Sequence, residues 1–265
     1  MQSIVATISY TGKAGKSTTA NNLLFPRLDS PAMFRIETIN ESGLSGAGGE
    51  EQKLKGREIE KLLKALSKTK SAIVDIGTSN VESFVMALTQ QPDSHRIFDY
   101  FIVPVEANSA KVNEFKEAVK TFTMLNKLGV EPERIKVVFN KLAPDSELED
   151  EMTRIFNFHK ECPIFTLNKK AVIHDTQAFK ALANAKKTYE EMLADKTDYW
   201  QKLKDTPLAE ENERTMLITM ARAQGLVKGL NAELDGVFNA LFSKDGRKAV
   251  KAAEVVMEID ASKFD

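Results

Sequence analysis

Short apolar runs alternate with amphipathic segments through the first two thirds of the chain. The runs are rich in β-branched and aromatic residues, a composition that favours strands. They lie at Ile4–Ser9, Met33–Thr38, Ser71–Ile76, Tyr100–Val105, Ile135–Asn140 and Pro163–Leu167. The segments between them carry apolar residues at helical spacing, as in Ile59–Leu66, Val81–Leu88 and Phe115–Leu128. This alternation predicts an α/β fold with a mostly parallel sheet and helices on both of its faces.

Two regions depart from this pattern. Four glycines fall within Ser42–Gly49, which predicts a loop. From about Thr188 onward the strand patterns stop, and helices are predicted over Leu208–Met220 and Leu226–Leu241. The second helix has one apolar face, which we expect to pack against the core or a sister helix. We therefore predict an α/β domain over residues 1–185 and a helical C-terminal extension over residues 186–265.

Composition narrows the class of protein without identifying it. The 265 residues are 42% hydrophobic and 28% charged, with a net charge of −1, as in ordinary globular proteins. No apolar run approaches the roughly 20 residues that cross a bilayer, and the N-terminus lacks a signal-peptide pattern. The single cysteine, Cys162, fits a reducing compartment. These features predict a cytoplasmic protein without a transmembrane segment.

The most informative chemistry follows the first apolar run. There Gly12-Lys13-Ala14-Gly15-Lys16-Ser17-Thr18 leads from a strand into a helix-compatible segment. The glycines allow a tight loop whose backbone N–H groups face phosphate oxygens, and the helix N-terminus favours the same anion. Lys16 is placed to reach β- and γ-phosphates, and the Ser17 hydroxyl to bind a magnesium ion. The pattern predicts a nucleotide site, although Tyr10 stands where the strict motif has glycine.

Three polar residues end other predicted strands. Asp75 ends a buried run and is placed to hold magnesium directly or through water, or else to cap the next helix. Glu37 lies before the glycine-rich loop, where it either orients water or magnesium or is an exposed strand-end carboxylate. Asn140 offers an amide to a purine edge, and is also a common turn residue.

Taken in order, these segments resemble the ParA/MinD family of deviant Walker A ATPases, over about residues 1–180. The matching segments are Gly12–Thr18, Ile73–Gly77, Asp99–Val105 and Val138–Lys141. The layout and C-terminal extension are most similar to plasmid StbB- or TraL-type relatives, which act in plasmid stability and conjugation.

The resemblance implies a switch that binds ATP and Mg²⁺ and forms an ATP-dependent homodimer. It also implies binding to a partner protein or to DNA without sequence preference. By the same resemblance, Lys16 contacts phosphates, Ser17 and Asp75 serve the metal, and Asn140 contacts adenine. ATP is favoured over GTP because Ala143 stands where an Asn-Lys-x-Asp motif has aspartate.

Two departures from the family pattern bear on hydrolysis. The signature lysine of the family falls at Thr11, and Lys13 lies two residues further on. The second acidic position of the switch strand is occupied by Ile39, which cannot hold an attacking water. We therefore predict nucleotide binding with weak or absent intrinsic hydrolysis.

Three functions are open at this point. The first is an ATP-dependent switch in plasmid or DNA positioning, the second a nucleotide-binding scaffold without turnover, and the third a metabolic P-loop kinase or ligase. For DNA contact, the candidate bases are Lys244, Arg247, Lys248 and Lys251, and the pair Lys169-Lys170. The alternative is a solvated helix face, which the many acidic residues nearby favour.

Overall fold

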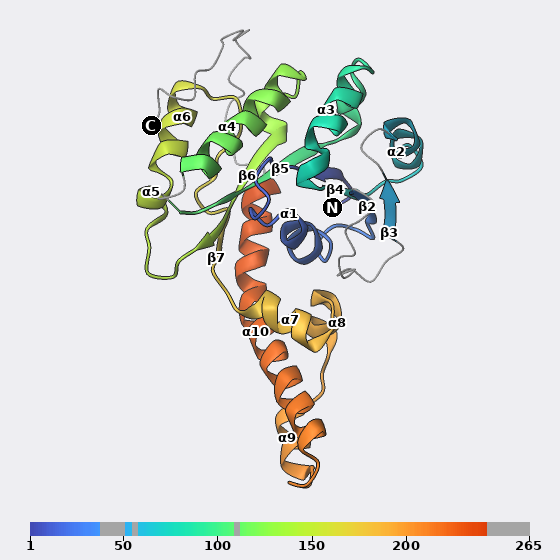
Figure 1. The fold of residues 1–265 in the computed structure, drawn as a ribbon, viewed down its shortest axis with the longest axis vertical. Coiled ribbons are helices and arrows are strands. Elements are labelled where there is room, and N and C mark those ends of the chain that lie inside the picture. The colour runs from blue at the N-terminus through green and yellow to red at the C-terminus, as the bar shows by residue number, and fades with distance from the viewer. Residues whose placement is uncertain (38–50, 55–57, 109–111, 243–265) are drawn as a thin grey trace.

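The computed structural model describes residues 1–37, 51–54, 58–108 and 112–242. Seven parallel strands form one sheet in the order β3-β2-β4-β1-β5-β6-β7 (Figure 1). They are β1 Ile4–Thr7, β2 Ala32–Ile36, β3 Glu51–Leu54, β4 Ala72–Ile76, β5 Tyr100–Glu106, β6 Ile135–Leu142 and β7 Val172–His174. The predicted parallel α/β fold is confirmed.

Helices cover both faces of the sheet. The α-helices are α1 Lys16–Thr18, α2 Ile59–Leu66, α3 Val81–Thr89, α4 Val112–Lys127, α5 Leu148–Glu151, α6 Thr153–Glu161, α7 Ala178–Ala185, α8 Tyr189–Ala194, α9 Tyr199–Asp205 and α10 Glu211–Phe242. A π-helix, η1 Thr19–Leu24, continues α1, and short 3₁₀ turns form η2 Thr78–Asn80, η3 Ser94–Ile97 and η4 Pro132–Arg134.

Alternation along the strands divides the core into two layers. In β1, Val5 packs with η1, α7, α8 and α10 on one face, whereas Ala6 packs with α2 to α6 on the other. The same alternation places Thr7, two residues after Val5, on the η1 face. Polar residues at that level of the sheet therefore lie beneath the helix that follows the first loop.

Three sequence predictions about elements need correction. Pro163–Leu167 is not a strand, since within it only Thr166 forms an isolated bridge, to Lys136, and β7 lies further along the chain. The two predicted C-terminal helices are one continuous helix, α10. Leu208 precedes that helix and is 81% exposed. The predicted loop Ser42–Gly49 lies outside the described residues.

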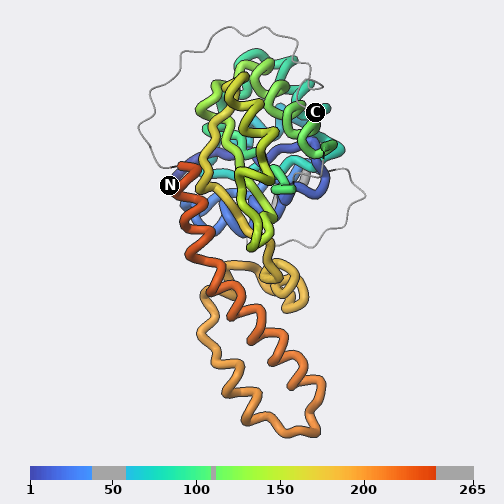
Figure 2. Tube along the Cα trace, turned by 90° about the vertical axis from the view of Figure 1, so that its left-hand side faces the viewer, coloured from blue at the N-terminus to red at the C-terminus, as the bar shows by residue number. Residues whose placement is uncertain are grey.

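The helix α10 connects the α/β body to a projecting hairpin. Its second half is buried against η1, α7 and the sheet through Val227, Leu230, Leu234, Val237 and Leu241. This confirms that the apolar face predicted in Leu226–Leu241 packs on the core. Its first half runs beside α9 and extends away from the body (Figures 1 and 2).

Candidate nucleotide site

The glycine-containing loop joins the carboxyl end of β1 to α1, at the middle of the sheet. Gly15 has φ +93°, which L side chains rarely adopt. A Cβ atom on Gly15 would lie 2.1 Å from Asn140 Nδ2. The same amide nitrogen donates to the Ala14 carbonyl at 2.8 Å. Gly15 is therefore required both for its conformation and for the close approach of β6.

Lys16 lies at the start of α1 and is only 6% exposed. Its Nζ donates to the Thr11 carbonyl at 2.8 Å and to Thr78 Oγ1 at 2.6 Å. Burial lowers the pKa of Lys16 to about 8, against the opposing effect of the nearby Asp75 charge. The ammonium group thus bridges the two sides of the loop mouth, from β1 to the segment after β4.

Lys141 supports the loop from outside. It has φ +60° at an irregularity of the β6–β7 pairing. Its Nζ donates to the Lys13 carbonyl at 2.8 Å and lies 3.5 Å from Glu106 Oε2. The side chain of Lys13 itself is exposed to solvent. The loop backbone is therefore held by two consecutive residues of β6, Asn140 and Lys141, while Lys13 points outward.

Asp75 lies under this loop, within a row of polar side chains across three strands. The register places Asp75 opposite Thr7 of β1 and opposite Arg35 of β2. Thr7 Oγ1 donates to Asp75 Oδ1 at 2.9 Å, and Arg35 Nη1 lies 3.5 Å from Oδ2. Both carboxylate oxygens therefore have partners within the protein.

Sequence reasoning missed Arg35. It interrupts an otherwise apolar strand, and its side chain is 8% exposed. Its Nη2 donates to Asn21 Oδ1 at 3.0 Å, which links β2 to the helix after the loop. A charged residue inside a buried strand pattern was the available signal, since such residues are almost never fully buried unless paired.

The residues fit a magnesium ion only in part. Ser17 is exposed beside Lys16 at the start of α1, as the expected metal-binding hydroxyl must be. Asp75 is 3% exposed and engaged by Thr7 and Arg35, so direct contact with a metal requires Arg35 to move. Contact between Asp75 and a metal through a bridging water does not require Arg35 to move. In the described part of the chain, no three His, Cys, Asp or Glu side chains form a metal-binding group.

The other predicted residues lie at the same sheet edge but differ in environment. Glu37 follows β2, with its Cγ 3.8 Å from where a Cβ on Gly77 would stand. Gly77 itself donates its N–H to the Ile36 carbonyl at 2.9 Å, a close approach that favours glycine. Asn140 is 3% exposed and its amide faces the loop backbone, so adenine contact stays a prediction. Ile39 and the basic cluster from Lys244 to Lys251 lie outside the described residues.

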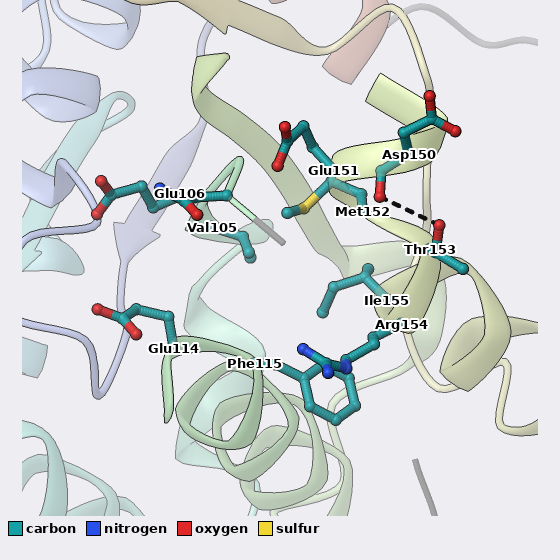
Figure 3. A pocket seen from close by; sticks show the side chains of 11 residues that line it. Val105, Glu106, Glu114, Phe115, Asp150, Glu151, Met152, Thr153, Arg154 and Ile155 are labelled. Atoms are coloured by element: carbon teal, nitrogen blue, oxygen red, sulfur yellow. Dashed lines mark hydrogen bonds between the residues drawn. The ribbon is translucent and has the colours of Figure 1, made fainter. Parts of the chain in front are cut away.

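A separate cavity of about 260 Å³ lies beyond the carboxyl end of β5 (Figure 3). Its floor is apolar, with Phe115, Met152 and Ile155. Four carboxylates and one guanidinium also line it, from Glu106, Glu114, Asp150, Glu151 and Arg154. Carboxylates repel phosphate, and this cavity is therefore a poor nucleotide-phosphate site compared with the loop around Lys16.

The fold and the loop together define a parallel α/β protein with a glycine-lysine loop at the carboxyl end of its central strand β1. No family model and no curated protein matches the chain. Among solved structures it is similar to a variant of Cyanothece McdA in complex with ATP, with a TM-score of 0.46 and 16% identity over 85% of this chain and 97% of that one. It is also similar to Cyanothece apo McdA, with a TM-score of 0.47 and 16% identity over 86% and 99%.

Within the described residues, no helix is both long and apolar enough to span a membrane.

Proposed function

We propose that this chain is an ATP-binding switch of the ParA/MinD type that acts in positioning or transfer of DNA. The observation that carries the proposal is the loop around Lys16. A buried ammonium stands at the mouth of a left-handed glycine turn, at the carboxyl end of a central parallel strand. That arrangement directs a cation and backbone N–H groups at a polyphosphate.

The loop also supports a role for Lys13 between two copies of the chain. Its carbonyl is held by Lys141, while its side chain is exposed at the sheet edge beside the loop. A lysine whose backbone is held and whose side chain is exposed to solvent supports contact with the phosphates of a second chain. In this proposal Lys16 serves its own nucleotide and Lys13 the nucleotide of the partner copy.

Weak intrinsic hydrolysis is part of the proposal. Thr11 faces the loop interior through its carbonyl, which accepts from Lys16, and it supplies no cation there. Ile39 supplies no group that holds water. Assembly with DNA or a partner protein would then complete the catalytic site.

Two measurements test this function. Size-exclusion chromatography with light scattering measures the molecular mass, and a phosphate-release assay measures ATP turnover. We expect a monomer without nucleotide, a dimer with ATP and Mg²⁺, and slow turnover that duplex DNA accelerates. Lys13→Ala should bind ATP but stay monomeric, whereas Lys16→Ala should neither bind ATP nor form the dimer. A dimer without any turnover would favour the nucleotide-gated scaffold. A monomer in all conditions that phosphorylates a small acceptor would establish the kinase or ligase alternative instead.

A further inference from the structure

Arg35 is the buried charge that the proposed function leaves unused. Its guanidinium lies within the sheet layer beneath η1, with 8% of the side chain exposed. Removing an arginine from water costs several kcal/mol unless close partners compensate the charge. The compensating groups include the Asp75 carboxylate at 3.5 Å and the side-chain amide oxygen Oδ1 of Asn21 at 3.0 Å.

The position of Arg35 determines what Asp75 can attract. A carboxylate binds Mg²⁺ through its negative charge and its free lone pairs. Thr7 engages one oxygen of Asp75, and the Arg35 guanidinium neutralises the charge near the other. The pair Arg35–Asp75 therefore presents little net charge to a metal ion at the loop.

We infer that Arg35 is a built-in counter-ion of Asp75 that makes nucleotide binding by this chain nearly independent of magnesium. The inference rests on the proposed function, because it concerns a nucleotide at the loop around Lys16. Arg35 is a positioning residue, since it acts through Asp75 and through Asn21 of the helix that follows the loop.

The experiment compares binding of a fluorescent ATP analogue in Mg²⁺ and in EDTA. Arg35→Met keeps the length of the side chain and removes its charge. Arg35→Lys restores a cation, and the double variant Arg35→Met with Asp75→Asn removes both charges and leaves no buried ion. Circular dichroism establishes that each variant is folded, and Lys16→Ala shows that binding occurs at the loop.

For the wild type we expect EDTA to weaken binding by less than about fivefold. For Arg35→Met, EDTA should weaken binding of the analogue by more than about tenfold. Without the arginine, Asp75 is available to the metal ion that EDTA removes. Arg35→Lys and the double variant should show the same small effect of EDTA as the wild type, whatever their affinity in Mg²⁺. If Arg35→Met is unfolded, the wild type and the double variant carry the test. Each should then lose less than about fivefold of its affinity for the analogue in EDTA.

The inference is overturned if EDTA lowers the affinity of the wild type for the analogue by more than about tenfold. It is also overturned if folded Arg35→Met has the same ratio of affinities in Mg²⁺ and in EDTA as the wild type. Binding that survives Lys16→Ala, or no wild-type binding in either solution, contradicts the proposed function itself and the inference with it.

Discussion

In the proposed function, Lys16 serves nucleotide binding at a cost to the stability of the fold. Its ammonium is buried against Thr11 and Thr78, and burial lowers its pKa to about 8 from 10.5. The ammonium group that we propose contacts a polyphosphate is thus held in surroundings that disfavour its own charge. Such a conflict is typical of functional sites.

We predict that Lys16→Met stabilises the protein at pH 7 by about 1–3 kcal/mol, while abolishing nucleotide binding. The unfolded chain keeps the Lys16 proton to about pH 10.5, and the folded chain only to about 8. Wild-type stability therefore rises between these pH values, and the advantage of the variant shrinks across the same window. Urea unfolding at pH 7 and pH 10 measures both effects; a variant less stable at pH 7 would refute the sign.

Gly15 and Gly12 form a matched pair for testing the loop geometry. A residue with a Cβ at position 15 must adopt a positive φ, and its Cβ overlaps the Asn140 side chain. A Cβ at position 12 has Thr78 as its nearest neighbour, at 3.9 Å. Gly15→Ala should cost about 2–4 kcal/mol and remove ATP binding, and Gly12→Ala should cost less than about 1 kcal/mol. Thermal unfolding and ATP titration check the pair. Equal effects of the two changes would contradict the assigned geometry.

At the scale of residues, the sequence predicted the glycine-lysine loop and the position of Asp75 near the end of a buried strand. It did not predict Arg35 as the partner of Asp75, because that contact depends on β2 lying beside β4. Nor did it show that Asn140 supports the loop, since the two are far apart in the chain. Contacts between strands require the sheet order, which local patterns do not contain.

At the scale of elements, α10 joins two environments in one helix. Its second half packs on the core, and its first half projects with Met216 57% exposed and Ile218 47% exposed. Gln224 Nε2 donates to the carbonyls of Asp195 and Thr197, which ties the base of the hairpin to the segment between α8 and α9. Arg214 donates to the carbonyls of Leu203 and Thr206 and so satisfies the end of α9.

The two halves of α10 should respond differently to the loss of a large side chain. Leu234 is fully buried, so Leu234→Ala should destabilise the protein by about 2–4 kcal/mol. Met216→Ala, in the exposed half, should change stability by less than about 0.5 kcal/mol. Urea unfolding measures both. A large effect at Met216 would show that the hairpin is covered in solution.

Periodicity predicted the strands of the central sheet and the buried half of α10. It separated α10 into two helices because Gly225 and the polar residues around it interrupt the apolar spacing. It also missed β3 and β7, edge strands of only four and three residues, which are too short to show a strand period. Edge strands are specified by their neighbours more than by their own residues.

For the whole molecule, the sheet order places the loop strand β1 between β4 and β5, in the middle of seven strands. The hairpin consists of α9 and the first half of α10. It projects away from the sheet, whereas the second half of α10 packs on the core (Figures 1 and 2). The candidate nucleotide loop and the hairpin are therefore spatially separate, which fits the proposal that one part of the chain binds ATP and another contacts a partner.

We predict that the hairpin can be removed without loss of nucleotide binding. Thr197 is hydrogen-bonded to Gln224 at the base of the hairpin, so a short glycine-serine linker in place of residues 198–218 has only the first turns of the retained helix to span. The shortened protein should bind ATP within about twofold of the wild-type affinity. Titration with a fluorescent ATP analogue measures this; a loss of more than about tenfold would show that the hairpin supports the loop.

The most direct test of the account is calorimetric titration of ATP into the full chain and into its Lys16→Ala variant. We predict saturable binding to the wild type and affinity reduced by more than about a hundredfold in the variant, with both proteins equally folded by circular dichroism. Equal binding by both proteins, or none by the wild type, would contradict the assignment of the loop around Lys16 as a nucleotide site.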